Sequence, residues 1–289
     1  MNARPGTSAA AAGSAPALAR PPLRFVSAAS LFDGHDAAIN MIRRLLQARG
    51  AEVVHLGHNR SVADIVRAAI DEDADAIAVS SYQGGHNEYF TYMVDMLRER
   101  GYAHVRVVVG GGGTIAPHEI EALERYGVEK IYTPEDGRRL GLAGMIDDVF
   151  ARIGAVRKPP YEFRPLNARD HGLIARTISV LEGADYEGSG GAQVEQIRRA
   201  LARSRQRVPV IGITGTGGAG KSSLTDELLA RLTRHFPALQ AAVVAMDPTR
   251  RRSGGALLGD RIRMNSLASR TSSCARSPRG GRTSPPPRC

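Results

Sequence analysis

The chain of 289 residues has no tryptophan and only two cysteines, Cys274 and Cys289, both close to its end. The body of the chain therefore offers neither a disulfide framework nor a cysteine metal site, and we expect a reducing, cytoplasmic setting. No apolar run approaches the ~18 residues that a membrane-spanning helix needs. These absences exclude a disulfide-rich secreted domain and give no reason to expect a membrane partner.

Lysine is also scarce, and the positive charge is unevenly distributed. The formal net charge is +10, but residues 250–289 hold ten arginines against a single acid, Asp260. Almost all of the excess charge thus belongs to the end of the chain and not to a folded face. A nucleic-acid partner is therefore not expected.

Residues 1–22 contain no acid and no run of large apolar residues, and alanine, proline, serine and glycine dominate them. This composition predicts a disordered leader. Because arginine occurs in a segment without acids, an organellar transit peptide is the alternative.

Strands and helices alternate over residues 23–153. Runs with strand character occur at 23–28, 51–56, 74–80, 105–109 and 129–132, and helical spacing at 37–49, from Ser61, at 89–100, from Pro117 and at 140–153. Ser61 and Asp64 form a start resembling a capping box, and Pro117 suits a first helical position. Alternation at this spacing predicts an α/β fold, a flavodoxin-like parallel sheet of five strands.

Asp33 and His35 stand two residues apart in the loop after the first predicted strand. Open α/β sheets bind ligands at the carboxyl ends of their strands. A carboxylate there can accept one ring N–H of a histidine and leave the other nitrogen for a metal. Taken alone, however, a histidine in such a loop is more often a helix cap or a solvated residue.

Three blocks of sequence resemble the cobalamin-binding domain of the adenosylcobalamin mutases and their methyltransferase relatives. That family has Asp-x-His-x-x-Gly, then Ser-x-Leu, then Gly-Gly. Here the blocks are residues 33–38, 80–82 and 110–113. Ala38 replaces the last glycine of the first block and Tyr82 replaces the leucine, but neither change removes a ligand atom.

The resemblance implies a role for each matching position. His35 would be the axial ligand of cobalt, with Asp33 fixing its tautomer. Ser80 would hydrogen-bond the buried nucleotide base, and the glycines would let the nucleotide tail approach the backbone: Gly110, Gly111 and Gly112. His55, His58 and His86 line the same edge; they are either surface polar residues or neighbours of the cofactor, with Gln83-Gly84-Gly85-His86 leaving room for corrin.

Residues 154–207 are predicted to be a linker with one helix, at 194–205, and Val208–Ile213 a new strand. A complete Walker A loop follows at residues 215–222, before a predicted helix at 221–235. Its backbone N–H groups form an anion nest at a helix N-terminus. The expected nucleotide-binding residues are Gly215, Gly218, Ala219, Gly220, Lys221, Ser222 and Ser223, with Ser222 also binding Mg²⁺.

A predicted strand at 241–246 leads into Asp247-Pro248, and Gly259-Asp260-Arg261-Ile262-Arg263-Met264 follows. This part resembles the metallochaperone GTPases that service cobalamin mutases. The resemblance implies Asp247 and Asp260 as Mg²⁺-associated carboxylates and Arg263 as a nucleotide contact. Residues 208–267 are thus expected to be the N-terminal part of a P-loop GTPase domain.

A cobalamin domain followed by a GTPase is the order found in the fused isobutyryl-CoA mutases. The resemblance implies adenosylcobalamin, GTP and Mg²⁺ as cofactors. In the intact family it also implies a homodimer and radical isomerisation of isobutyryl-CoA, the acyl-CoA substrate, to butyryl-CoA. The barrel that binds the substrate is not recognised here, so mutase turnover by this chain is not expected.

The likeness ends near Leu267, and residues 268–289 lack apolar periodicity. We expect a disordered basic tail and interpret it as the product of a frameshift or assembly error, a natural basic tail being the alternative. For the whole chain, the alternative function is a stand-alone cobalamin carrier or sensor. A methylmalonyl-CoA mutase fragment fits less well, because there the cobalamin domain comes last.

Overall fold

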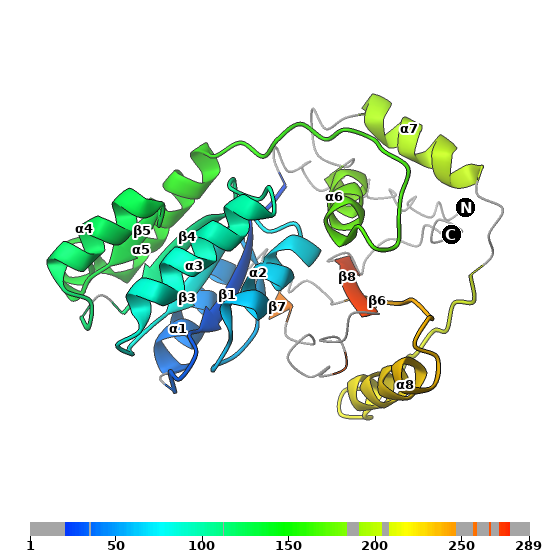
Figure 1. Ribbon diagram of the computed structural model, residues 1–289, viewed down its shortest axis with the longest axis horizontal. Coiled ribbons are helices and arrows are strands. Elements are labelled where there is room, and N and C mark those ends of the chain that lie inside the picture. The colour runs from blue at the N-terminus through cyan, green and yellow to red at the C-terminus, as the bar shows by residue number, and fades with distance from the viewer. Residues whose placement is uncertain are drawn as a thin grey trace, which may run out of the picture.

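The computed structural model describes residues 21–34, 36–111, 113–183, 191–203, 208–246, 257–258, 266 and 272–277. Figure 1 shows the sheet of the first part of the chain with helices packed around it. No helix in the described segments is long and apolar enough to cross a membrane.

Five parallel strands form the sheet in the order β5-β4-β3-β1-β2, which confirms the flavodoxin-like prediction. They are β1 (Arg24–Ala29), β2 (Glu52–His55), β3 (Ala76–Ser80), β4 (Arg106–Gly110) and β5 (Lys130–Tyr132). A short strand from the later part of the chain, β7 (Leu257–Leu258), pairs with β2 at the edge. The carboxyl ends of all five strands meet at one edge of the sheet.

Five helices connect and follow these strands: α1 (Asp36–Ala48), α2 (Val62–Asp71), α3 (His86–Glu99), α4 (Pro117–Tyr126) and α5 (Pro134–Ala155). Ser61 caps α2 by accepting a hydrogen bond from Asp64 N, as predicted. α5 begins well before its predicted start, because Thr133 caps it. Its backbone kinks at Gly141, where φ is +66°, and this interrupts the helical periodicity on which the prediction rested.

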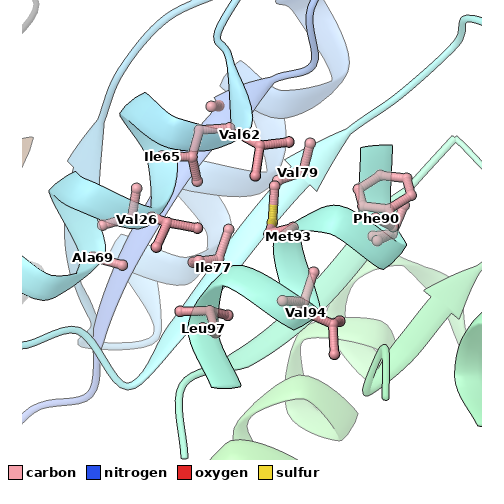
Figure 2. Packing of buried hydrophobic residues seen from close by; sticks show 14 of the residues in the cluster. Val26, Val62, Ile65, Ala69, Ile77, Val79, Phe90, Met93, Val94 and Leu97 are labelled. Carbon is pink, nitrogen blue, oxygen red and sulfur yellow. The ribbon is translucent and has the colours of Figure 1, made fainter. Parts of the chain in front are cut away.

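The two faces of the sheet bury different side chains, since successive residues of a strand point to opposite sides. On one face Val26, Ile77 and Val79 pack against helices α2 and α3, and Figure 2 shows Met93 of α3 lying over Ile77 and Val79. On the other face Ala78 and its neighbours pack against α1 and α5. Both faces are covered, which explains why consecutive strand residues such as Val53 and Val54 are both apolar.

The predicted linker contains two helices instead of one, α6 (His171–Glu182) and α7 (Gly191–Ala202). α6 lies against the first domain: a Cβ on Gly172 would meet Tyr102 Oη at 1.6 Å, and Glu182 pairs with Arg24 at 3.2 Å. The sequence prediction missed α6 because these stabilising contacts come from residues far away in the chain.

The later part of the chain differs from its prediction in two places. Residues Val208–Ile213 form no strand, and Val210 is 83% exposed. An apolar run becomes a strand only when another strand pairs with it, and β6 (Ala241–Met246) pairs with β8 (Ser272–Ser277) instead. β8 lies in the segment expected to be a disordered tail; backbone pairing needs no apolar periodicity. The remaining tail residues lie outside the described segments. Helix α8 (Lys221–His235) begins at the predicted residue.

Candidate functional site

Asp33 connects two loops at the carboxyl edge of the sheet. Its side chain is 2% exposed, and Oδ2 accepts a hydrogen bond from Tyr82 N at 2.9 Å. The β1–α1 loop is thereby tied to the loop that follows β3. His35, the predicted cobalt ligand, lies outside the described residues. The roles of both residues toward cobalt therefore stay predictions.

Phe32 is a feature of this edge that the sequence analysis did not single out. It has φ +64° and an 83% exposed side chain, and its backbone N–H donates to Asn59 Oδ1 at 3.0 Å. Asn59 also has a positive φ, +55°. Such conformations cost about 1–3 kcal/mol each in non-glycine residues and cluster at functional sites. No sequence signal marks Phe32, because an aromatic residue rarely adopts a positive φ, whereas asparagine adopts it more readily.

Ser80 and Gly110 lie opposite each other where strands β3 and β4 end, because they are register partners. Ser80 is 3% exposed and its Oγ has no hydrogen-bond partner. A Cβ built on Gly110 would meet no atom within 4 Å. A buried hydroxyl without a partner is costly in the absence of a ligand. Here it stands beside a space that glycine leaves open.

The row that contains Ser80 and Gly110 continues to Tyr132 on β5. Tyr132 belongs to the apolar cluster under α1 and α5, so the row faces that layer. Its hydroxyl donates to Asp148 Oδ2 on α5 at 2.7 Å, and burial, with help from that carboxylate, raises the pKa of Tyr132. The ring therefore forms a fixed neutral wall next to Gly110.

Packing within the protein requires a glycine at position 111, whether or not a ligand is bound. Its φ is +101°, and a Cβ would lie 2.0 Å from the Ser81 carbonyl oxygen. This glycine lets the β4–α4 loop approach the backbone of the neighbouring loop. Gly112 lies outside the described residues. Of the predicted glycines, Gly110 has the geometry expected of a ligand contact, and Gly111 that of a tight packing contact.

Two of the three edge histidines are buried, not surface residues. His55 ends β2 and its Nδ1 lies 3.0 Å from Ser27 Oγ. His86 begins α3 and contacts Glu119 on α4. Hydrogen bonds from Ala116 N, Asn87 and His86 lower the pKa of Glu119 to about 2. His58 is exposed in its loop, as predicted for a surface polar residue.

The Walker loop has the backbone of an anion nest. Gly215, Gly218 and Gly220 all have positive φ, and Gly220 caps the start of α8 in the left-handed conformation. Lys221 Nζ donates to the carbonyl oxygens of Gly215 at 3.0 Å and Thr216 at 2.8 Å. The ammonium group is thus folded onto its own loop, close to where a phosphate chain would lie.

Ser222 and Ser223 lie in the first turn of α8, directly after Lys221. The other predicted residues of the nucleotide site lie outside the described segments: Asp247, Asp260 and Arg263. Within the described segments, no group of three or more His, Cys, Asp or Glu side chains could hold a metal ion. The Mg²⁺ and nucleotide roles of all these residues therefore stay predictions.

Two protein-family models match the chain. The model described as the B12 binding domain matches residues 23–136. The model described as methylmalonyl Co-A mutase-associated GTPase MeaB matches residues 174–283, a range that includes most of α6 and part of the predicted tail. The chain therefore contains a B12-binding domain followed by a MeaB-type P-loop GTPase domain.

Individual proteins are also similar to this chain. A fused isobutyryl-CoA mutase of Geobacillus kaustophilus is 55% identical over 255 residues, which cover 86% of this chain and 23% of that protein. The pivalyl-CoA mutase small subunit of Xanthobacter autotrophicus is 34% identical over 118 residues, 40% of this chain and 77% of that subunit. A cobalamin-binding protein of Desulfitobacterium hafniense, a solved structure, has a TM-score of 0.37 at 22% identity and covers 45% of this chain and 58% of its own. The chain spans less than a quarter of the fused relative.

Proposed function

The chain belongs to the B12-binding acyl-CoA mutase family and corresponds to the N-terminal part of its fused isobutyryl-CoA mutases, and on this premise we propose that it holds cobalamin at the carboxyl edge of the sheet. His35 is the residue proposed to bind cobalt. Ser80 and Gly110 receive the nucleotide tail. Asp33 orients His35 while it also holds the backbone of Tyr82.

The observation that supports this proposal is the pairing of Ser80 with Gly110. A hydroxyl buried without a partner needs a hydrogen-bonding ligand, and the open space at Gly110 is where that ligand can enter. A nucleotide base offers both a flat apolar face and hydrogen-bonding edges, so it suits a polar atom in an apolar cleft. Gly111 does not support this proposal, because its close packing against the Ser81 carbonyl already accounts for a glycine at that position.

Bound adenosylcobalamin supplies the radical chemistry of these mutases. The residues of this chain bind and orient it. A neutral imidazole is the metal ligand, and a carboxylate on its other nitrogen raises its basicity. For the fused protein as a whole we propose isobutyryl-CoA as the substrate, butyryl-CoA as the product and a homodimer as the assembly. The cytoplasmic setting expected from the cysteine content stays a prediction.

We propose that the Walker loop binds the phosphates of GTP. Lys221 needs only to turn from the carbonyls of Gly215 and Thr216 to reach them. Ser222 is the proposed Mg²⁺ ligand, Ser223 lies near the α-phosphate, and Asp247, Asp260 and Arg263 complete the site. The anion nest and the dipole at the start of α8 both favour a phosphate there.

A cobalamin titration followed by the visible spectrum tests the first site. Wild type is expected to bind cobalamin with the lower base displaced and a histidine in its place. His35→Ala is expected to lose that spectrum. His58→Ala, an exposed histidine at the same edge, is the matched control and is expected to behave as wild type. A His35→Ala protein with an unchanged spectrum would refute His35 as the ligand.

A fluorescent GTP analogue tests the second site. Lys221→Ala is expected to weaken binding by at least about tenfold, since a charged hydrogen bond contributes about 1.5–3 kcal/mol. Arg231→Ala is the control. It removes an exposed cation of the same helix, which pairs with Glu227 and lies ten residues after Lys221 in the sequence. Equal effects of the two substitutions would contradict a specific phosphate site.

A further inference from the structure

Asn59 lies in the loop after β2, and the proposed function gives it no role. We propose that Asn59 is a positioning residue for the cobalt site: its carboxamide holds the turn at residues 30–33, from which the chain continues to His35. This inference rests on the proposed function for its ligand, cobalamin. The turn itself is formed by contacts within the protein.

The turn at residues 30–33 carries an unusual residue at its strained position. Asp33 N donates to the Ser30 carbonyl oxygen at 3.1 Å, which closes a turn of four residues. Phe32 is the third residue of this turn and has φ +64°, a conformation that favours glycine or asparagine there. Packing does not offset the strain, because the Phe32 side chain is 83% exposed. Strained residues persist where the surrounding structure holds them, and they cluster at functional sites.

Asn59 supplies a contact that holds the strained residue. Its Oδ1 accepts the Phe32 backbone N–H at 3.0 Å. Asn59 has a positive φ of its own, +55°, which asparagine tolerates better than most residues. The bond therefore joins two left-handed residues, one in the loop after β1 and one in the loop after β2.

The loop that carries Asn59 is itself fastened to the domain. Arg60 N donates to the Ala29 carbonyl oxygen at 3.2 Å. Ala29 N in turn donates to the Gly57 carbonyl oxygen at 2.9 Å. From α3, the buried Tyr89 donates its hydroxyl to the Arg60 carbonyl oxygen at 2.6 Å. Asn59 is thus held between residues that pair with the end of β1, so its acceptor oxygen has a fixed place.

The first and last residues of the turn are held from the other side, by the loop after β3. Ser30 Oγ donates to Ser81 Oγ at 3.1 Å, and both serines are fully buried. Asp33 Oδ2 accepts the Tyr82 backbone N–H. A turn that is fixed from both sides leads the chain toward the metal ligand in one geometry. Such preorganisation lowers the entropy lost on binding.

The acceptor and the backbone conformation of Asn59 can be changed separately in the full chain. Asn59→Gly keeps a residue suited to a positive φ but removes Oδ1. Asn59→Asp keeps an acceptor oxygen on a side chain of the same length. Asn167→Gly is the matched control: Asn167 is also an exposed loop asparagine, and its Oδ1 accepts the Arg169 backbone N–H at 3.0 Å.

Amide hydrogen exchange without cobalamin tests the contact. In Asn59→Gly the Phe32 amide is expected to exchange about two- to tenfold faster, the effect of one neutral hydrogen bond. Asn59→Asp and Asn167→Gly are expected to keep the wild-type rate at Phe32. An unchanged Phe32 rate in Asn59→Gly would overturn the proposal, and this result does not depend on the proposed function.

A cobalamin titration followed by the visible spectrum tests the consequence. Asn59→Gly is expected to bind about two- to tenfold more weakly and to show less of the histidine-ligated spectrum at saturation. Asn59→Asp is expected to restore both, and Asn167→Gly to match wild type. A loss of stability alone would not change the share of bound cobalamin that has histidine on the metal.

The outcomes separate this inference from the proposed function. A wild-type chain that binds no cobalamin would remove the proposed function, and the positioning role with it. Cobalamin binding by wild type, with the same affinity and spectrum in Asn59→Gly, would remove the positioning role alone. Equal weakening in Asn59→Asp and Asn59→Gly would show that the acceptor oxygen is not responsible, which also contradicts the proposal.

Discussion

The B12-binding domain and the nucleotide-binding segment both place a glycine-containing loop in front of a helix, yet their surroundings differ. In the first, the loops stand on a sheet of five strands with helices buried against both faces. In the second, α8 buries a single apolar residue, Leu229, against partly buried Ala241 and Val243. The run before the loop, Val208–Ile213, is exposed.

This difference shows that the geometry of a binding site can come from a local motif or from the surrounding scaffold. The Walker loop reaches the backbone conformation of an anion nest from local glycines alone. The cobalamin edge, in contrast, depends on pairs that the sheet brings together, such as Ser80 with Gly110. We therefore expect core substitutions to destabilise the first domain more than the region around α8, although both regions carry a glycine-containing loop.

The largest effect is expected for Phe90→Ala. Phe90 of α3 is fully buried in the apolar cluster on the sheet face covered by α2 and α3 and is labelled in Figure 2. Removing its ring should lower the free energy of unfolding by about 3–5 kcal/mol, through lost apolar burial and the cavity left behind. Chemical denaturation followed by circular dichroism measures the change. A loss below about 1 kcal/mol would mean that this core is no better packed than the second region.

The next largest effect is expected for Gly111→Ala, because the new Cβ would meet the Ser81 carbonyl and φ is unfavourable. The expected loss is about 3 kcal/mol in the free energy of unfolding. Gly110→Ala is the matched control: its Cβ meets nothing, so stability should stay within about 0.5 kcal/mol of wild type while cobalamin binding weakens. A destabilised Gly110→Ala protein would remove the assignment of that space to a ligand.

A smaller effect is expected for Leu229→Ala in α8. Its neighbours Ala241 and Val243 are only partly buried, so they can follow the truncated side chain and little cavity remains. We expect a loss of about 1 kcal/mol, well under the range of about 2–5 kcal/mol for a dense core. Denaturant unfolding monitored near α8 gives the value. A loss as large as that of Phe90→Ala would abolish the contrast between the regions.

The smallest effect concerns pH and Glu119. Its carboxyl has a pKa of about 2 in the folded chain against an ordinary value of 4.5, so folding favours the ionised form. The resulting stabilisation is present above about pH 4.5 and is lost as the pH falls toward about 2. The acid-induced loss of thermal stability should therefore be less steep in Glu119→Gln. Identical acid profiles of the two proteins would show that this carboxylate adds nothing.

Much of the first domain could be predicted because its signals are local. Alternation of apolar residues placed the five strands and most of the helices, and Ser61 and Pro117 marked two helix starts. α6 could not be found in this way. Its fit to Tyr102 and Arg24 joins residues that are distant in the chain. Val208–Ile213 was predicted as a strand from composition, but strand formation requires a pairing partner.

The candidate site was also predictable only where its signals are local. The sequence blocks that resemble the cobalamin-binding family indicated Asp33, Ser80 and the glycines, and the Walker loop was complete in the sequence. They could not separate Gly110 from Gly111, because the difference lies in what a Cβ would touch. Nor could they show that His86 is buried between two acceptors.

By itself, the sequence determined the sheet and the residue types available at each loop, since these depend on local periodicity and on side-chain chemistry. Its resemblance to two known families indicated the order of the two domains. The tertiary structure alone decided which polar groups are left without a partner and which are held. Ser80 has an unpartnered hydroxyl and His86 lies between two acceptors only because strands and helices distant in sequence pack together. Burial turns such ordinary side chains into a site, because a polar group shielded from water must find its partner within the protein or its ligand.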